Sequence, residues 1–165
     1  VLEMASVSYG YAITTYVGQN LGAKKYRRIR NGVRSGVYMA LITSIVISGV
    51  MVITGRNILS LFVSGEAGQV KQVLDIAYKY LFIMAIFLWV LYLLYVYRSA
   101  IQGLGNTLIP LASGVVEFCM RVGVALLLPK LIGEDGIFYA EISAWSGAAI
   151  LLIVSYVVII RKYKE

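Results

Sequence analysis

Five long stretches of predominantly apolar residues divide the chain. They cover about residues 1–20, 31–54, 73–102, 108–129 and 137–160. Each is close to or above the roughly 20 residues that an α-helix needs to cross the hydrocarbon core of a bilayer. The pattern predicts an all-α polytopic membrane helix bundle with about five transmembrane helices, in which residues 1–165 form a single transmembrane domain.

Small residues recur at four-residue steps in the first and last of these stretches. They are Ser6, Gly10, Thr14 and Gly18 in the first, and Ala140, Ala144 and Ala148 in the last. Lipid provides no hydrophobic driving force between helices, so small residues that allow close packing mark the faces where helices touch. We interpret both stripes as helix-packing faces.

The composition supports a membrane protein. Apolar residues make up 60% of the 165 residues and charged residues 14%, against roughly 45–50% and about 25% in soluble domains. A soluble chain of this length could not bury so much apolar surface in one core. A soluble globule, a disordered chain and a disulfide-stapled secreted domain are therefore excluded.

The positive charges are distributed unevenly between the predicted loops. One side carries Lys24, Lys25, Arg27, Arg28, Arg30, Arg34, Arg98, Arg161, Lys162 and Lys164. The other side carries Arg56, Lys71, Lys79 and Lys130, together with acids that include Glu66 and Asp75. Because Lys and Arg accumulate in cytoplasmic loops, the first loop and the C-terminus are predicted to be cytoplasmic in a multi-pass protein of the cell (inner) membrane. The charges flank apolar stretches, so their expected partner is the lipid bilayer and not nucleic acid.

Two absences argue against an enzyme. The chain has no histidine, and its single cysteine, Cys119, lies inside an apolar stretch. A histidine-dependent catalytic triad, a histidine-ligated metal and a redox dithiol are excluded within this chain. We expect no catalytic residues, no bound metal and no cofactor.

Glu117 and Arg121 lie inside the fourth predicted span. Residues four apart share one face of a helix, and ionisable groups at this depth are costly unless they meet a partner or a watery cavity. One interpretation is a mutually neutralising pair that orients the helix. The other is an ion-coupling site, in which the protonation or the partner of the carboxylate changes during transport.

Aromatic residues near the middle of the third span are candidates for a substrate path. Trp89, Tyr92 and Ser99 are predicted on one face, with Tyr95 at its margin. Such a face could hold a flat apolar or cationic ligand by stacking and cation–π contact. Buried packing is the alternative interpretation.

Two motifs resemble one family of transporters. The string YVGQNLGAKKYRRIRNGVR at residues 16–34 is similar to the stretch after the second helix of the C-terminal lobe in MATE (multidrug and toxic compound extrusion) proteins. The string RSAIQGLGNTLIPLASGVVEFCMR at residues 98–121 also resembles that family, including its QGLGNT turn, the following proline and a Glu/Arg pair. The resemblance covers essentially the whole chain.

The resemblance implies a larger protein with twelve helices in two lobes. The five spans would be the eighth to twelfth helices, and their partner would be the missing N-terminal lobe of the same chain. MATE members export organic cations and other amphipathic drugs in exchange for Na⁺ or H⁺, by rocking between two states. The resemblance thus implies a cation-coupled multidrug efflux antiporter, present here as a fragment, with Na⁺ or H⁺ as coupling ion.

The chain departs from one branch of the family, which has a cation-binding aspartate in the tenth helix. Counting back from the QGLGNT turn, the equivalent position is Leu91. Coupling would then depend on Glu117 or on acids of the missing lobe. Two alternatives stay open: a lipid-linked oligosaccharide flippase of the same superfamily, and a non-transporting membrane scaffold subunit.

Overall fold

The structure, a computed structural model, describes residues 3–63 and 67–163. Its elements are α1 (Met4–Gly22), α2 (Tyr26–Ser60), α3 (Ala67–Ile86), α4 (Leu88–Gly103), α5 (Leu108–Leu127), the short α6 (Pro129–Ile132), a 3₁₀ turn (Glu134–Ile137) and α7 (Phe138–Ile160). The described residues contain no strand, and the predicted all-α bundle is confirmed. Residues 1–2 of the first predicted span, and Glu66 and Lys164 of the charge distribution, lie outside the described residues.

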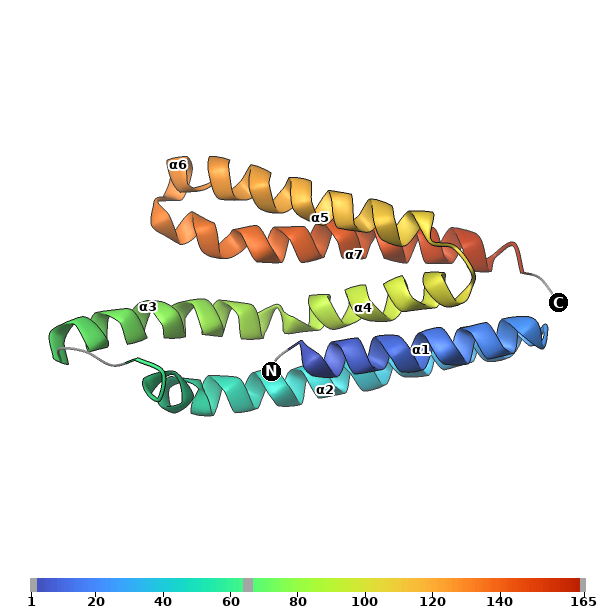
Figure 1. Ribbon diagram of the computed structural model, residues 1–165, viewed down its shortest axis with the longest axis horizontal. Coiled ribbons are helices and arrows are strands. Elements are labelled where there is room, and N and C mark those ends of the chain that lie inside the picture. Colours follow the sequence, from blue (N-terminus) through green and yellow to red (C-terminus); the bar gives the residue numbers. More distant parts are fainter. Residues whose placement is uncertain (1–2, 64–66, 164–165) are drawn as a thin grey trace.

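Helix α4 lies at the centre of the bundle. It packs against α1 and α2 on one side and against α7 on the other, and α5 covers the far side of α7 (Figure 1). Most residues of α4 are buried, among them Leu88, Leu94 and Ile101, which are at most 1% exposed. The core of the protein is therefore built around α4.

Helices α1 and α4 approach each other closely because small residues line their contact. A Cβ atom added at Gly10 would lie 2.8 Å from the Ser99 hydroxyl oxygen. A Cβ atom added at Gly103 would lie 2.7 Å from Cβ of Val17 and 2.8 Å from the backbone oxygen of Thr14. The Thr14 hydroxyl also donates a hydrogen bond to the Ser99 carbonyl oxygen, at 3.2 Å. The predicted packing stripe of the first helix faces α4.

The alanine stripe of the last helix is likewise buried. Ala140, Ala144 and Ala148 are at most 5% exposed. The neighbouring Gly147 faces α5, where an added Cβ would lie 3.1 Å from the Met120 side chain. Small residues on two sides of α7 therefore let it pack between α4 and α5.

The predicted span over residues 73–102 is divided into two helices, because the chain bends by 49° between α3 and α4. Phe87 leaves the helical conformation, with φ −96° and ψ 5°. The Ser48 hydroxyl of α2 donates a hydrogen bond to the Ala85 carbonyl oxygen at 2.6 Å. That oxygen would accept the N–H of Trp89 in a continuous helix. A side chain that inserts into the hydrogen-bond ladder in this way is a known cause of helix kinks.

Within residues 3–63 and 67–163, three helical segments are long and apolar enough to cross a membrane, namely Tyr26–Ser60, Leu108–Ile132 and Asp135–Ile160. The bent pair of α3 and α4 passes the same test when its two halves are taken together, which makes up to four. Helix α1 occupies the first predicted span but is not among these segments, since serine and threonine lower its hydropathy. Its passage through a membrane stays a prediction.

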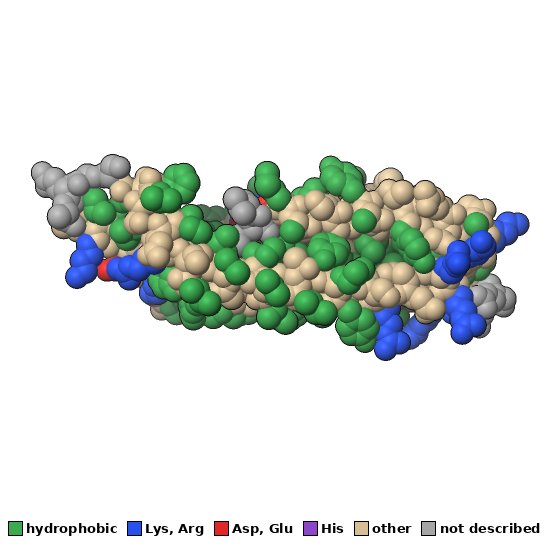
Figure 2. Space-filling model, turned by 90° about the horizontal axis from the view of Figure 1, so that it is seen from below, with side chains coloured by type: hydrophobic (Ala, Val, Ile, Leu, Met, Phe, Trp, Pro, Cys, Tyr) green, Lys and Arg blue, Asp and Glu red, His purple; other side chains and the backbone are tan. Residues whose placement is uncertain are grey.

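The predicted loops fall at the expected ends of the bundle. The α1–α2 loop, the α4–α5 turn and the end of α7 lie at one end, and α6 lies at the other (Figure 1). Figure 2 shows Lys and Arg side chains at the two ends of one face, with hydrophobic side chains between them. Exposed apolar residues such as Ile53, Phe118 and Ile150, all at least 64% exposed, fit a belt in contact with lipid.

The α1–α4 contact gives a stability prediction. Gly103→Ala places a methyl group against the backbone of α1, and overpacking of this kind costs about 1–3 kcal/mol. The matched control is Gly114→Ala in α5, where an added Cβ meets nothing within 4 Å and the better helix propensity of alanine favours the folded state. Thermal unfolding of the chain in detergent, followed by circular dichroism, measures both. Equal unfolding temperatures for the two variants would contradict the close contact.

Candidate functional site

A salt bridge joins α4 to α5 inside the bundle. The Arg98 guanidinium pairs with the Glu117 carboxylate, and the two side chains are 22% and 18% exposed. Arg98 also donates a hydrogen bond to the Ser113 hydroxyl at 3.0 Å, and Ser113 donates to the Pro110 carbonyl oxygen at 2.7 Å. Arg98 is therefore fixed by two side chains of α5 and lies within α4, so its expected place in a loop is wrong.

A second salt bridge joins α5 to α7. Arg121 donates to a carboxylate oxygen of Glu141 at 2.7 Å. Its Nε atom is buried and has no hydrogen-bond partner among the described residues. Together the two salt bridges connect α4, α5 and α7.

The predicted neutralising pair of Glu117 with Arg121 is therefore wrong in its partners. The two residues do share one face of α5, as their spacing requires. That face lies against helices that bring in Arg98 and Glu141, so each charge is neutralised across a helix interface. Sequence reasoning missed Arg98 and Glu141 as the partners. Both are charged residues within apolar stretches, and that position alone could have indicated that each needs a partner.

A cleft of 210 Å³ between α1 and α4 lies beside the first salt bridge. Its lining includes Gly10, Tyr11, Thr14, Tyr95, Arg98 and Ser99. Of the substrate-path candidates, Tyr95 and Ser99 thus share one cleft with Arg98. Because Arg98 both lines this cleft and holds Glu117, a charged molecule in the cleft would change the electrostatic environment of the carboxylate.

The other two substrate-path candidates lie elsewhere. Trp89 is 44% exposed, next to the break at Phe87. Tyr92 is fully buried, with its ring centroid 6.2 Å from that of Tyr9. The Tyr92 hydroxyl has no hydrogen-bond partner within the described part of the chain. The structure separates these residues from the cleft, and their contact with a substrate stays a prediction.

The described residues form no group of three or more Asp, Glu, Cys or His side chains that could hold a metal ion. Leu91 is 3% exposed and belongs to the hydrophobic core. The surroundings of Leu91 are therefore apolar, as is its own side chain. Glu117 is an acid next to the cleft, because it contacts Arg98 and Arg98 lines the cleft.

The QGLGNT motif forms the turn between α4 and α5. Gly105 has φ +82°, a conformation that side chains disfavour. Its N–H bonds to the Gln102 carbonyl at 2.9 Å, and the N–H of Asn106 bonds to the Ile101 carbonyl at 3.2 Å. These two bonds form a Schellman motif. The Asn106 side chain then accepts the N–H of Ile109 at 3.1 Å, so the motif ends one helix and begins the next.

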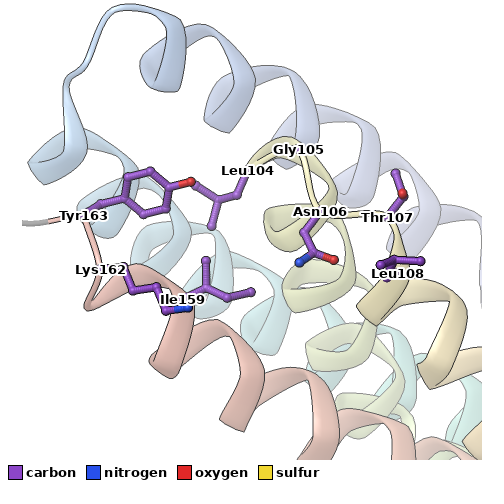
Figure 3. Close-up of a pocket in the computed structure, with 8 residues that line it drawn as sticks. All are labelled: Leu104, Gly105, Asn106, Thr107, Leu108, Ile159, Lys162 and Tyr163. Carbon is purple, nitrogen blue, oxygen red and sulfur yellow. The ribbon is translucent and has the colours of Figure 1, made fainter.

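This turn borders a pocket of 450 Å³ at the basic end of the bundle. Figure 3 shows Asn106 and Thr107 on the turn, with Ile159 of α7 and the following residues Lys162 and Tyr163 on the other side. The pocket lies away from both interhelical salt bridges. The QGLGNT motif is thus a structural turn. Of its residues, Gln102 lines the cleft beside Arg98.

Comparison with known families gives one finding. The family model described as MatE matches residues 1–127, which is the chain up to the end of α5. The match includes Arg98, Glu117 and Arg121, and it stops before Glu141. A comparison with curated proteins finds no match.

The salt bridges give a prediction on coupling. In a double-mutant cycle with Arg98→Gln and Glu117→Gln, we expect a coupling free energy of about 0.5–3 kcal/mol, the range for side chains in contact. The same cycle on Glu117 and Arg121 should give a smaller value, because Arg121 contacts Glu141 instead. Thermal unfolding of each single and double variant in detergent measures both. A larger coupling between Glu117 and Arg121 would restore the pairing within α5.

Proposed function

Because the chain belongs to the MatE family, whose model covers more than three quarters of it, we propose that it forms part of the C-terminal lobe of a cation-coupled multidrug efflux antiporter. At the family level, MatE proteins are multidrug and toxic compound extrusion transporters and not enzymes. The apolar helices of this chain agree with a multi-pass membrane protein. The family match carries this proposal.

We propose that Glu117 couples the ion to the substrate. While Glu117 is ionised, it neutralises Arg98 at the edge of the cleft. Binding of H⁺ to the carboxylate removes that neutralisation and leaves a positive guanidinium facing the cleft, which repels an organic cation. Proton entry and cation release are then linked by one side chain, as antiport requires. Na⁺ would act similarly by competing with Arg98 for the carboxylate oxygens.

The cleft has the chemistry to hold the proposed substrates. Tyr11 and Tyr95 provide aromatic faces, to which organic cations bind through the ring quadrupole. The hydroxyl of Thr14 and that of Ser99 provide polar contacts at the closest approach of α1 and α4. We propose that the other wall of the site comes from the N-terminal lobe of the same transporter.

An export assay tests this function. The complete reading frame that contains this chain is expressed in efflux-deficient cells, and ethidium export is followed by fluorescence. We expect Glu117→Gln to lower the export rate severely, because an amide cannot take up the proton or bind the Na⁺ that displaces the substrate. The control Asp75→Asn removes a carboxylate from an exposed salt bridge with Arg56 and should leave the rate unchanged.

The outcomes of the assay are distinct. Normal export by Glu117→Gln at normal membrane abundance would eliminate the coupling role of Glu117. Absence of ethidium export by the unmodified protein, and of export of other organic cations, would overturn the efflux proposal itself.

The charge distribution gives a prediction on topology. Lys25→Cys and Lys130→Cys are introduced separately after Cys119, which is exposed, is replaced by serine. In intact cells a membrane-impermeant maleimide should label position 130 and not position 25, because basic loops face the cytoplasm. Labelling of position 25 alone would reverse the proposed orientation.

A further inference from the structure

A second cleft lies at the basic end of the bundle, between α2, α4 and α7. Its volume is 310 Å³, and its lining includes Arg30, Val33, Arg34, Val37, Tyr97 and Tyr156. It shares no lining residue with the cleft beside Arg98. The proposed transport cycle makes no use of it.

Two arginines give this cleft a positive rim. Arg30 and Arg34 are four residues apart and lie on one face of α2. Neither has a carboxylate partner among the described residues. Arg30 donates to the Tyr163 carbonyl oxygen at 2.6 Å, and Arg34 donates to the Tyr38 hydroxyl at 3.2 Å. Each guanidinium has five N–H donors, so both retain donors for an anion.

The inner wall of the cleft is aromatic and apolar, with one polar group. The rings of Tyr97 and Tyr156 pack at a centroid distance of 5.4 Å. Tyr156 is 7% exposed, and its hydroxyl has no hydrogen-bond partner in the described part of the chain. Buried polar groups are almost always hydrogen-bonded, so the Tyr156 hydroxyl is an unsatisfied donor of a residue that lines the cleft.

From these features we propose that the cleft binds the phosphodiester headgroup of an anionic phospholipid. The planar fork of an arginine matches the geometry of a phosphate. Tyr38 also lines the cleft, and Ile42 and Ile45 follow it at helical spacing along α2; all three are at least 54% exposed. This surface gives acyl chains an apolar path that inorganic phosphate does not need.

The position of the cleft selects the leaflet. Its lining includes residues from the first turns of α2 and the last turns of α7, and these parts of the two helices lie at the same end of the bundle (Figure 1). The charge distribution places that end in the cytoplasm, and anionic lipids are concentrated in the cytoplasmic leaflet. The site and its ligand therefore occur on the same side of the membrane.

Lipid titration of the purified chain tests the proposal. The chain is delipidated in neutral detergent and titrated with dioleoyl phosphatidylglycerol or dioleoyl phosphatidylcholine, and native mass spectrometry counts the lipids bound. We expect phosphatidylglycerol to bind at least about tenfold more tightly, a difference consistent with two cationic contacts to the headgroup. Equal affinities for the two lipids would overturn the proposal.

Paired variants separate a built site from diffuse charge. Arg30→Gln with Arg34→Gln should abolish the preference for phosphatidylglycerol. Arg27→Gln with Arg28→Gln removes two exposed charges from the same segment of α2, outside the cleft lining, and should preserve it. Equal losses in the two double variants would show a nonspecific basic surface and contradict the site.

Two further arms complete the test. Tyr156→Phe removes the buried hydroxyl alone and should weaken phosphatidylglycerol binding severalfold without changing phosphatidylcholine binding. A lysine pair covers the case in which the glutamine variant does not fold. Arg30→Lys with Arg34→Lys keeps both charges but loses the planar guanidinium groups, so it should still weaken binding. The control is Arg27→Lys with Arg28→Lys, which should bind more tightly than the first pair. Displacement of the lipid by millimolar inorganic phosphate would identify a free-anion site and overturn the lipid proposal.

Discussion

The approach of α1 to α4 at Gly10 and Gly103 is the constraint from which the rest of the bundle follows. In lipid, where no hydrophobic effect draws helices together, association depends on packing and on hydrogen bonds between helices. The absence of side chains at these two positions brings the Thr14 hydroxyl to the Ser99 carbonyl oxygen. Gly10 also lines the cleft in which Arg98 lies. The candidate site therefore includes a glycine that carries none of its chemistry.

Helix α5 is held to the bundle by charge pairs as well as by packing. Its described residues include two buried ones, Pro110 and Ser113, and it lies on the outside of α7 (Figure 1). Two salt bridges supplement this packing, through Glu117 to α4 and through Arg121 to α7. Electrostatic contacts strengthen as the local dielectric falls. A change in the charge of Glu117 should therefore alter the position of α5 more than the position of a helix that is held by packing alone.

What the sequence could predict was decided by local properties. Hydropathy placed the helical segments because the thickness of a bilayer fixes the length of an apolar stretch. The four-residue spacing of Glu117 and Arg121 predicted their common face, but their partners depend on which helices lie opposite, which spacing alone does not specify. The break at Phe87 also depends on a residue distant in the sequence. The hydroxyl that bonds the Ala85 carbonyl oxygen belongs to Ser48, which is 37 residues away. Of the four aromatic and polar candidates in the third span, Tyr95 and Ser99 reached the cleft and Trp89 and Tyr92 did not.

The interruption at Phe87 also has a mechanical consequence. A continuous helix is a stiff rod, and a displacement at one end moves the other end with it. Here α4 packs against neighbouring helices on both sides, whereas α3 is joined to it at an angle of 49° by Phe87, which is not in the helical conformation. A break of this kind transmits force less rigidly than a continuous helix does, so a displacement of α3 is not carried directly into α4 and the groups that α4 positions.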